Sequence, residues 1–411
     1  MKRFGNIWPT FCTVENAVQA IYQGTANKRD DKNVAAAFFY SESEVAANPD
    51  LYRIINPQRA EIYAKRLVAK LSAGTWQPHR PYKMRRWCRA HNALGGKWRY
   101  IDCAALEDHI VQWMLILAIM PALKRGMYKH TCGSVPKRGP EHVRKYVERW
   151  VRNDKQSAFF VKLDIRKFFP SIEHALMMDC LKRVIKDERI LRLCLQIIQS
   201  TGETEKGIAV GFFSSPWFGN LLLQSLDYYI MQQLFKLRRG KRIPYVTHLV
   251  RYVDDILLLG SSKRDLDKAV RAIRGKLHSD YHLDIKSTWE VKAIAEHVTD
   301  EQGHWRLKPG TAWVDICGYK FSREATILRD SLFLSTTRKA RRICRIKAET
   351  NTIRDADASA LLSKVGWAKR VQNRRFYQKH IDPYVDMQEL KGVISDAAKR
   401  RVRHAPRAVH S

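Results

Sequence analysis

The chain has 411 residues, of which 74 are lysine or arginine and 41 are aspartate or glutamate, for a formal net charge of +33. A hydrophobic content of 45% is that of a globular protein, and the length predicts two or three subdomains around one continuous core. This ratio of basic to acidic residues is far from that of a typical soluble protein. It favours a polyanionic partner, because lysine and arginine release condensed counterions from phosphates. Nucleic acid is the first interpretation, while an anionic membrane surface and a merely soluble basic protein stay open.

Targeting and redox signals are few. The start, MKRFGNIWPTFC, lacks a sustained apolar segment, so no signal peptide is expected. The longest apolar run, residues 111–123, is too short to cross a bilayer and contains Pro121, so we expect a cytoplasmic protein with no membrane partner. None of the eight cysteines forms a CxxC pair, and all are predicted to be reduced, mostly core residues.

The first 150 residues predict helices around one basic hairpin. Apolar residues at helical intervals over 56–72 indicate an amphipathic helix with a cationic face. Residues 79–102 predict two arginine- and lysine-rich strands joined at Gly95-Gly96. A further helix is expected from about residue 105.

After residue 158 the pattern changes to strands. A buried strand ends in Asp164, and a helix capped by Ser171 is expected after it. A glycine-marked loop from residue 207 enters a second apolar helix, and residues 311–321 predict a strand pair. Beyond about residue 330 the chain is predicted to be helical and strongly basic, and residues 396–411 are expected to form a disordered basic tail.

Two adjacent aspartates interrupt the stretch THLVRYVDDILLLGSSK, residues 247–263. Its apolar runs predict a hairpin that projects Asp254 and Asp255 from the turn. On this stretch alone, a solvated Asp-Asp turn is an equal alternative. A third carboxylate, Asp164, has the same setting at a strand end, and the three converge if the elements lie side by side. Such oxygen ligands suit Mg²⁺, and two ions roughly 4 Å apart activate an attacking hydroxyl and stabilise a leaving pyrophosphate.

Four stretches in order resemble the motifs of reverse transcriptases. VKLDIRKFFPSI is similar to their first palm motif, VGFFSSPWFGNLLL to the template-contacting motif, RYVDDILLLG to the YxDD hairpin with Tyr252 at its start, and ICGYKF, which contains Gly318 and Tyr319, to the primer-grip hairpin. The resemblance runs from about residue 80 to 321. It implies an α+β right-hand polymerase with an N-terminal extension (1–50), fingers (51–152 with part of 171–205), a palm with an antiparallel sheet (153–325), a helical thumb (326–395) and the basic tail (396–411).

The resemblance also implies site roles by position. Asp164, Asp254 and Asp255 correspond to the catalytic metal ligands, with two Mg²⁺ ions and Mn²⁺ as a possible substitute. The positions that correspond to dNTP binding are Lys97, Arg99, Phe169, Val210, Gly211 and Lys286. Phe169 corresponds to a steric gate, and the alternative is that it is a core phenylalanine. For the basic residues, the alternative is a solvated side chain without a binding role. The nucleic-acid-binding positions are Lys137, Arg138, Arg144, Tyr252, Gly318 and Tyr319, the first three at the start of a predicted helix.

Details of the motifs bear on the lineage. Val210 stands where many reverse transcriptases have glutamine, as in enzymes of diversity-generating retroelements, but Ser215-Pro216 follows as in group II intron enzymes. A bacterial retroelement or antiviral-defence enzyme fits best. The resemblance therefore implies an RNA-directed DNA polymerase that uses dNTPs to make cDNA, with the thumb arginines and Trp367 along the minor groove of the duplex. The surplus charge leads to the hypothesis that the N-terminal segment and the thumb also grip a structured noncoding RNA that serves as template. A homo-oligomer is left open. The alternatives are a template-independent or protein-primed DNA polymerase, and a catalytically silent RNA-binding scaffold or splicing cofactor.

Overall fold

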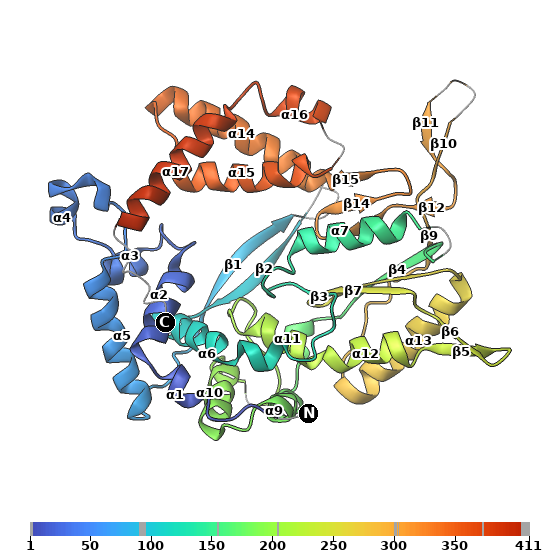
Figure 1. Ribbon diagram of the computed structural model, residues 1–411, viewed down its shortest axis with the longest axis horizontal. Helices are drawn as coiled ribbons and strands as arrows, with labels where there is room; N and C mark the ends of the chain where they lie inside the picture. Colours follow the sequence, from blue (N-terminus) through green and yellow to red (C-terminus); the bar gives the residue numbers. More distant parts are fainter. Residues whose placement is uncertain are drawn as a thin grey trace.

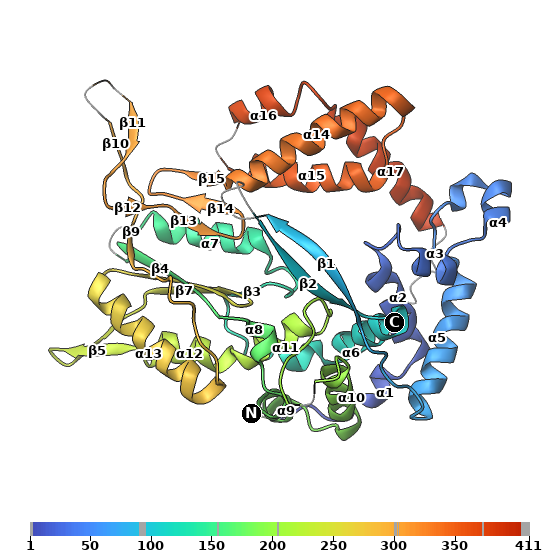
Figure 2. The same cartoon turned by 180° about the vertical axis from the view of Figure 1, so that it is seen from behind.

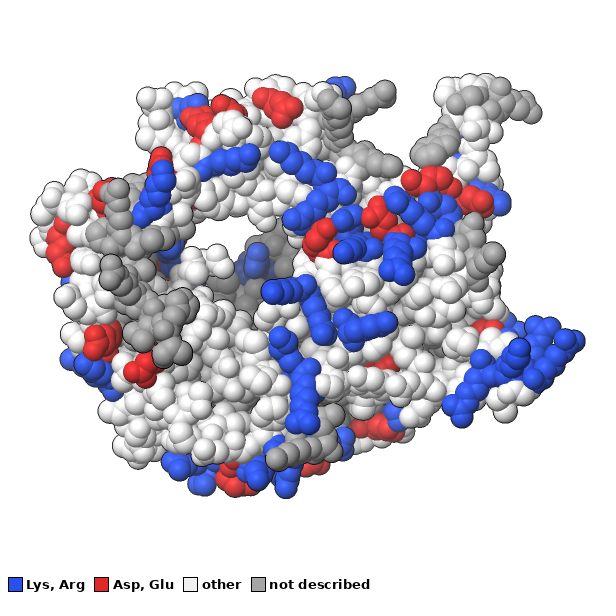
Figure 3. Space-filling view, viewed as in Figure 1, with Lys and Arg blue, Asp and Glu red and all other residues white. Residues whose placement is uncertain are grey.

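The computed structural model describes residues 3–89, 96–153, 156–203, 205–299, 302, 304–371 and 374–403. A helical body, a central sheet and a second helical body are arranged in a ring, and a long two-stranded hairpin crosses between them (Figures 1 and 2). The space-filling view shows an opening between these bodies (Figure 3). This is the fingers, palm and thumb arrangement of a right-hand polymerase.

The palm sheet has six strands in the order β12-β9-β4-β8-β7-β3. Strand β4 pairs antiparallel with β8, and β8 pairs antiparallel with β7, whereas β3 is parallel to β7 and β12 is parallel to β9. The strands span Thr131–Cys132 (β3), Phe159–Asp164 (β4), His248–Tyr252 (β7), Asp255–Gly260 (β8), Lys292–Ile294 (β9) and Thr311–Ala312 (β12). The predicted strand that ends in Asp164 and the hairpin around the two aspartates are both present.

Two hydrophobic clusters share this sheet as a wall. Side chains of a strand alternate between the two faces, so each strand serves both clusters. Val161 and Leu258 face a first cluster that also includes helices of the fingers. Leu257 and Leu259 face a second cluster that includes the thumb. By the same alternation, Asp164 and Asp255 lie on the thumb-facing side.

Helices cover both faces of the sheet (Figure 1). On one face α12 contacts β7, and α13 contacts β4 and β8; on the other, α7 contacts β3, β7 and β14. The palm helices span Pro140–Val151 (α7), Phe168–Ser171 (α8), Ser215–Leu222 (α11), Gln224–Gln232 (α12) and Lys263–Tyr281 (α13). Helix α7, which was predicted to belong to the fingers, is therefore part of the palm, because Val143 and Val147 are buried in the second cluster. Ser171 ends α8 instead of capping the next helix, whose N-cap is Glu173.

The fingers form one body with the N-terminal region. Helix α2 packs on α5 and α6, and Ala17, Ala20 and Ile21 are fully buried there, so residues 1–50 are not a separate extension. The predicted amphipathic helix is α5, with Asn56 as its N-cap. The helices span Trp8–Phe11 (α1), Val14–Thr25 (α2), Lys32–Phe38 (α3), Glu42–Ala47 (α4), Pro57–Ser72 (α5), Leu106–Lys124 (α6), His174–Val184 (α9) and Glu188–Gln199 (α10), with a 3₁₀ turn at Pro49–Leu51.

Helix α6 is apolar all round. Among the described residues it is the one helix long and apolar enough to cross a membrane. Ten of its residues are buried, however, and its apolar side chains belong to the first cluster. An all-round apolar surface is what a helix at the centre of a folded body requires.

Several short sheets project from or flank the palm. Strands β1 (Tyr82–Arg89) and β2 (Gly96–Cys103) form the predicted fingers hairpin, whose Gly95 turn lies outside the described residues. Strands β13 and β14 form the predicted pair, and β15 joins them, so the palm extends to residue 328. The remaining strands span Phe235–Arg238 (β5), Lys241–Pro244 (β6), His297–Thr299 (β10), Trp305–Leu307 (β11), Val314–Ile316 (β13), Tyr319–Phe321 (β14) and Thr326–Leu328 (β15).

The thumb is helical, as predicted, and lies across the opening from the palm and fingers (Figures 1 and 3). Its helices span Asp330–Thr350 (α14), Asp355–Lys369 (α15), Arg374–His380 (α16) and Met387–Arg403 (α17). Because α17 continues to Arg403, the prediction of disorder from residue 396 is wrong as far as residue 403, and residues 404–411 lie outside the described residues.

Candidate active site

Three aspartates meet at one end of the palm sheet. Asp164, the last residue of β4, lies directly opposite Asp255, the first residue of β8, in the antiparallel register. Asp254 precedes Asp255 in the two-residue turn between β7 and β8. The structure therefore brings together the three carboxylates that the sequence predicted.

A strained turn presents Asp254. Val253 has φ of +59°, a left-handed conformation that is unfavourable for a β-branched residue. Two contacts hold it: the Val253 amide donates to the Cys132 carbonyl at 3.1 Å, and the Arg251 guanidinium donates to the Val253 carbonyl at 3.0 Å. Gly133 makes room beside the turn, since a Cβ there would lie 2.7 Å from the Val253 side chain.

Arg251 is the centre of a buried polar network beneath this turn. Its guanidinium donates to both carboxylate oxygens of Asp227 at 2.7 Å, and both side chains are fully buried. It also donates to the Asn220 side-chain oxygen at 2.9 Å. Thr131 donates to Asp227 at 2.7 Å, and the Asn220 amide donates to the Gly133 carbonyl at 2.9 Å. One fully satisfied ion pair thus ties α11, α12, β3 and the catalytic turn together.

Two of the three carboxylates form ion pairs with lysines. Lys286 Nζ lies 2.6 Å from Asp164 Oδ2, and Lys162 Nζ lies 3.3 Å from Asp255 Oδ2. The Lys286 amide also donates to the Asp164 carbonyl at 2.9 Å, which fixes this segment beside the end of β4. All four side chains remain between about a quarter and a half exposed. Within the described part of the chain, no three His, Cys, Asp or Glu side chains are already grouped so as to hold a metal ion.

Electrostatics distinguish the third carboxylate. Burial, and then the charges of Asp255 and Asp164, raise the pKa of Asp254 to about 6, against a smaller lowering by Arg99. Arg99 is exposed on β2, directly opposite Arg86, and Lys97 is exposed on the same face of the hairpin. The charge of Arg99 on the fingers hairpin therefore acts on Asp254, while a triphosphate-binding role for Lys97 and Arg99 stays a prediction.

The template-contacting loop locks onto the base of the same hairpin. The Val210 amide donates to the Asp102 carboxylate at 2.9 Å, and the Asp102 amide donates to the Val210 carbonyl at 2.7 Å. Gly211 has φ of +119°, and a Cβ there would lie 2.5 Å from Ile101, so glycine is required. Phe169 is partly buried and accepts from the Ile208 amide at 3.0 Å, which brings the predicted steric gate and this loop side by side.

A hollow lies between the aspartates and the thumb. It measures about 470 Å³, and its lining includes Tyr252, Asp255, Gly318 and Trp367. Gly318 has φ of +86°, and a Cβ there would lie 2.8 Å from Trp367. In the space-filling view, lysine and arginine gather on the thumb and palm beside the central opening of the molecule (Figure 3).

The structure contradicts two predicted nucleic-acid contacts, Tyr319 and Arg144, and places Lys137 and Arg138 before the helix instead of at its start. Tyr319 is fully buried and stacks on Trp367, with ring centroids 5.5 Å apart, so Tyr319 does not face nucleic acid and Trp367 holds the thumb on the palm. Arg144 lies in α7, largely buried between Glu141 and Glu148 at 2.7 and 2.6 Å, so it stabilises the helix. Lys137 and Arg138 precede α7 in a loop; Lys137 is exposed, while Arg138 donates to the Tyr128 carbonyl at 2.9 Å.

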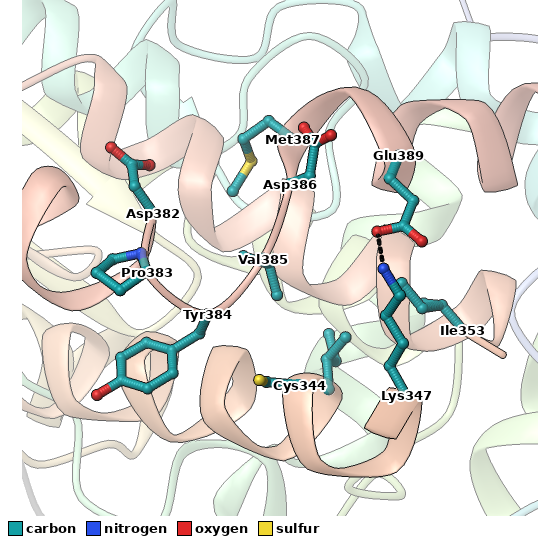
Figure 4. A pocket seen from close by; sticks show the side chains of 11 residues that line it. Cys344, Lys347, Ile353, Asp382, Pro383, Tyr384, Val385, Asp386, Met387 and Glu389 are labelled. Carbon is teal, nitrogen blue, oxygen red and sulfur yellow. Dashed lines mark hydrogen bonds and ion pairs between the residues drawn. The ribbon is translucent and has the colours of Figure 1, made fainter. Parts of the chain in front are cut away.

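A larger hollow of about 570 Å³ lies within the thumb (Figure 4). Helix α14 and residues 382–389 line it, and Lys347 pairs with Glu389 at 2.7 Å at its edge. The residues predicted for catalysis do not line it. We therefore place the chemistry in the hollow beside the aspartates.

The fold and this carboxylate cluster define a right-hand polymerase palm with its fingers and thumb. Residues 91–288 match the family "Reverse transcriptase (RNA-dependent DNA polymerase)", a range that contains all three aspartates. The chain therefore carries a reverse transcriptase domain over this range.

Similarity to individual proteins is lower. Protein YkfC of Escherichia coli K12 is 23% identical over 237 residues, which are 50% of this chain and 61% of YkfC, so the chain spans about three fifths of that relative. Telomerase from Candida albicans, solved with a fragment of telomeric RNA, gives a TM-score of 0.41 at 10% identity, covering 83% of this chain and 64% of that one. Apo telomerase from Candida tropicalis gives 0.45 at 11% identity, covering 91% and 66%.

Sequence reasoning missed two parts of the site. Lys162 shares a face with Asp164 because it lies two residues earlier in the same strand, a signal that was available. The Arg251–Asp227 pair joins residues 24 positions apart, and its one sequence signal is a lone aspartate within an apolar helix.

Proposed function

We propose that the protein is an RNA-directed DNA polymerase that makes cDNA by two-metal nucleotidyl transfer. The observation that carries this proposal is the convergence of Asp164, Asp254 and Asp255 on the thumb-facing side of the palm, opposite Arg99 of the fingers. In the proposed reaction a primer 3′-hydroxyl attacks the α-phosphate of a dNTP, and pyrophosphate leaves.

Divalent cations fit the donor set. Carboxylate oxygens are hard ligands that suit Mg²⁺, with Mn²⁺ as a substitute. Burial first, and then the charges of Asp255 and Asp164, raise the pKa of Asp254, and a bound cation would favour its ionised form. Asp164, Asp254 and Asp255 would hold the ions, in exchange for the contacts that Lys286 and Lys162 make with two of them. Bound metal supplies charge neutralisation and lowers the pKa of the attacking hydroxyl.

The other groups of the site hold the nucleotide. Arg99, whose charge acts on Asp254, and Lys97 on the same strand would bind the triphosphate. Lys286, once released from Asp164, would contact the leaving pyrophosphate. Phe169 is fixed against the segment that leads to Val210 and Gly211, as a rigid gate against a ribose 2′-hydroxyl needs to be.

The template in this proposal is a structured noncoding RNA in the cytoplasm, and the programme is retroelement copying or antiviral defence. The support is the net charge of +33 and the basic rim of the central hollow, where phosphates would release counterions. An RNA-containing duplex offers its shape and 2′-hydroxyls to the thumb.

The test is incorporation of labelled dNTPs by protein purified with its bound nucleic acid, followed by sequencing of product and RNA. Wild type is compared with Asp254→Asn/Asp255→Asn, and Asp280→Asn, an exposed carboxylate on α13, is the matched control. We expect Mg²⁺-dependent DNA complementary to the RNA from wild type and control, and none from the double variant.

Other outcomes separate the alternatives. Product with no counterpart in the RNA would establish template-independent or protein-primed synthesis. Equal product from the double variant would overturn the assignment of the site. RNA binding with no synthesis by wild type, over a range of primers and metals, would establish a silent scaffold or splicing cofactor.

A further inference from the structure

A basic hairpin projects from the palm at a distance from the aspartates. Strands β5 and β6 pair antiparallel over residues 235–244, FKLRRGKRIP, which contain five basic and no acidic residues. Most of its side chains are exposed, and Leu237 near the tip is 70% exposed. Like charges repel in so short a ribbon, so this composition has a cost unless a polyanion binds it.

The base of the hairpin is fixed, whereas its tip is free. Lys236 pairs with Asp265 of α13 at 2.5 Å, and the Tyr245 amide donates to the Leu234 carbonyl at 2.9 Å. Arg242 lies over the Phe235 ring at 4.6 Å. The other three cations, Arg238, Arg239 and Lys241, have no acidic partner among the described residues. The hairpin is therefore a rigidly mounted group of charges that the fold itself does not use.

The surface continues onto α13. Arg264, Lys268 and Arg271 are exposed at helical spacing i, i+4, i+7, so they lie along one side of the helix. Lys268 reaches to 6.0 Å from the Tyr245 ring, at the base of the hairpin. The hairpin and this helix side form one basic surface, which we call the outer basic surface.

The outer basic surface is separate from the catalytic hollow. β6 leads into the start of β7, whereas the aspartates follow the end of β7, so the two sites lie at opposite ends of one strand. In both ribbon views the β5–β6 hairpin points away from the thumb, and the space-filling view shows its basic tip isolated from the basic rim of the central hollow (Figures 1, 2 and 3). One short duplex in the hollow does not reach both.

We propose that the outer basic surface binds the phosphate backbone of a double-stranded segment of RNA that lies outside the catalytic hollow. The inference rests on the proposed function, since it concerns how the same polymerase holds its RNA. Arginine forks suit phosphate oxygens, and contacts to phosphates position a nucleic acid without reading its sequence. A membrane is less well matched, because Leu237 alone offers little apolar area to insert.

The test compares two variants of the full chain with equal loss of charge. The first is Arg238→Ala/Arg239→Ala/Lys241→Ala/Arg242→Ala; the control is Arg66→Ala/Lys182→Ala/Arg183→Ala/Arg192→Ala, four exposed cations on α5, α9 and α10. Binding of a long RNA stem-loop without a primer end is measured over a range of salt concentrations. Extension of a primer–template just long enough to fill the hollow is measured in parallel.

We expect the hairpin variant to lose about tenfold or more in stem-loop affinity near physiological salt, and to show a log K against log salt slope shallower by about 2 or more. The control should lose less than about threefold, and extension of the short primer–template should stay within about twofold for both. Arg238→Lys/Arg239→Lys/Arg242→Lys, which keeps the charge, should bind within about threefold of wild type.

Equal losses of stem-loop affinity in the two four-residue variants, or an unchanged salt slope, would overturn the proposal. So would a loss of affinity that is seen only for a DNA duplex of the same length, or only for anionic phosphatidylglycerol vesicles. If wild type binds the stem-loop through the hairpin but extends no primer, the proposed polymerase activity fails and this surface stands. If wild type extends primers but the hairpin variant binds the stem-loop as tightly as wild type does, the outer basic surface proposal fails and the proposed polymerase activity stands.

Discussion

Two kinds of carboxylate–cation pair lie within a few residues of one another in the palm, and they differ in what surrounds them. Arg251 and Asp227 are fully buried and bidentate, and every contact is satisfied. Lys286 with Asp164, and Lys162 with Asp255, are single contacts on side chains about a quarter to a half exposed. The buried pair fixes the backbone of the turn, whereas the exposed pairs are free to exchange the lysine for another cation.

The difference follows from desolvation. Breaking a buried pair leaves an unpaired charge in the core, so that pair cannot take part in a reaction cycle. An exposed pair contributes little stability and costs little to break. A polymerase site therefore benefits from rigid ionic support below the turn and exchangeable ionic contacts above it. The following predictions test this division.

The largest effect is expected for Asp254→Asn. It removes the charge that a metal ion needs while keeping the shape, so dNTP incorporation should fall by about 10³-fold or more, equivalent to about 4 kcal/mol. Because burial disfavours the ionised form of Asp254, the thermal midpoint should stay level or rise. Steady-state incorporation and calorimetry measure both. An active variant would remove Asp254 from the proposed site.

Next in size is Arg251→Met, which should lower the free energy of unfolding by about 3 to 5 kcal/mol, because Asp227 is left buried and unpaired. Arg251→Met/Asp227→Leu should regain most of this in chemical denaturation, yet stay low in kcat, since the Val253 carbonyl has lost its donor. Full activity in the stable double variant would show that the network supports the fold alone.

A smaller effect is expected for Lys286→Gln. Less Mg²⁺ should half-saturate the enzyme, because no lysine competes for Asp164, while kcat/KM for dNTP should fall about tenfold, or 1.4 kcal/mol. The control is Lys292→Gln, which replaces an exposed lysine on β9 that pairs with Glu290. It should change neither quantity by more than about twofold. Opposite shifts in the two quantities distinguish exchange from a structural role.

The smallest effect concerns a histidine, His248, which is partly buried and whose protonation burial disfavours. Burial lowers the pKa of His248 to about 4, where its ring stacks on Trp150 at 4.7 Å. The unfolded chain protonates His248 near pH 6.5, so stability falls as the pH drops from 6.5 towards 4. His248→Phe keeps the stack and should be more stable than wild type by about 1 kcal/mol at pH 5.5, and close to it at pH 7.5. His278→Gln, an exposed histidine, should show no such gain.

The local elements of the site were predictable because each has a local cause. The apolar run that ends in Asp164 specifies a strand, and the alternation around Asp254 specifies a hairpin, so both were predicted correctly. The register that places Asp164 opposite Asp255 was a conditional expectation, because pairing between residues 91 positions apart is set by the whole sheet.

Predictions that depended on what a side chain faces were less successful. Tyr319 lies in a motif that resembles a nucleic-acid contact, yet the thumb covers it, and Trp367 comes from 48 residues further along the chain. Arg144 was predicted to contact phosphate. The i−3 and i+4 spacing of Glu141 and Glu148 in the sequence, however, already indicates ion pairs within the helix. Burial by a distant segment of the chain could not be predicted from the sequence, whereas the ion pairs within the helix could.

The shared wall between the two hydrophobic clusters has a consequence for how the molecule melts. Strands β4, β7 and β8 give alternate side chains to the fingers-side and thumb-side clusters, so the thumb-side cluster cannot dissolve without stripping one face of the strands that carry the aspartates. We expect palm and thumb to unfold as a single cooperative unit in calorimetry, with activity lost along the same curve. A substitution that loosens the thumb-side cluster should then also lower the temperature up to which the strands hold the three aspartates together.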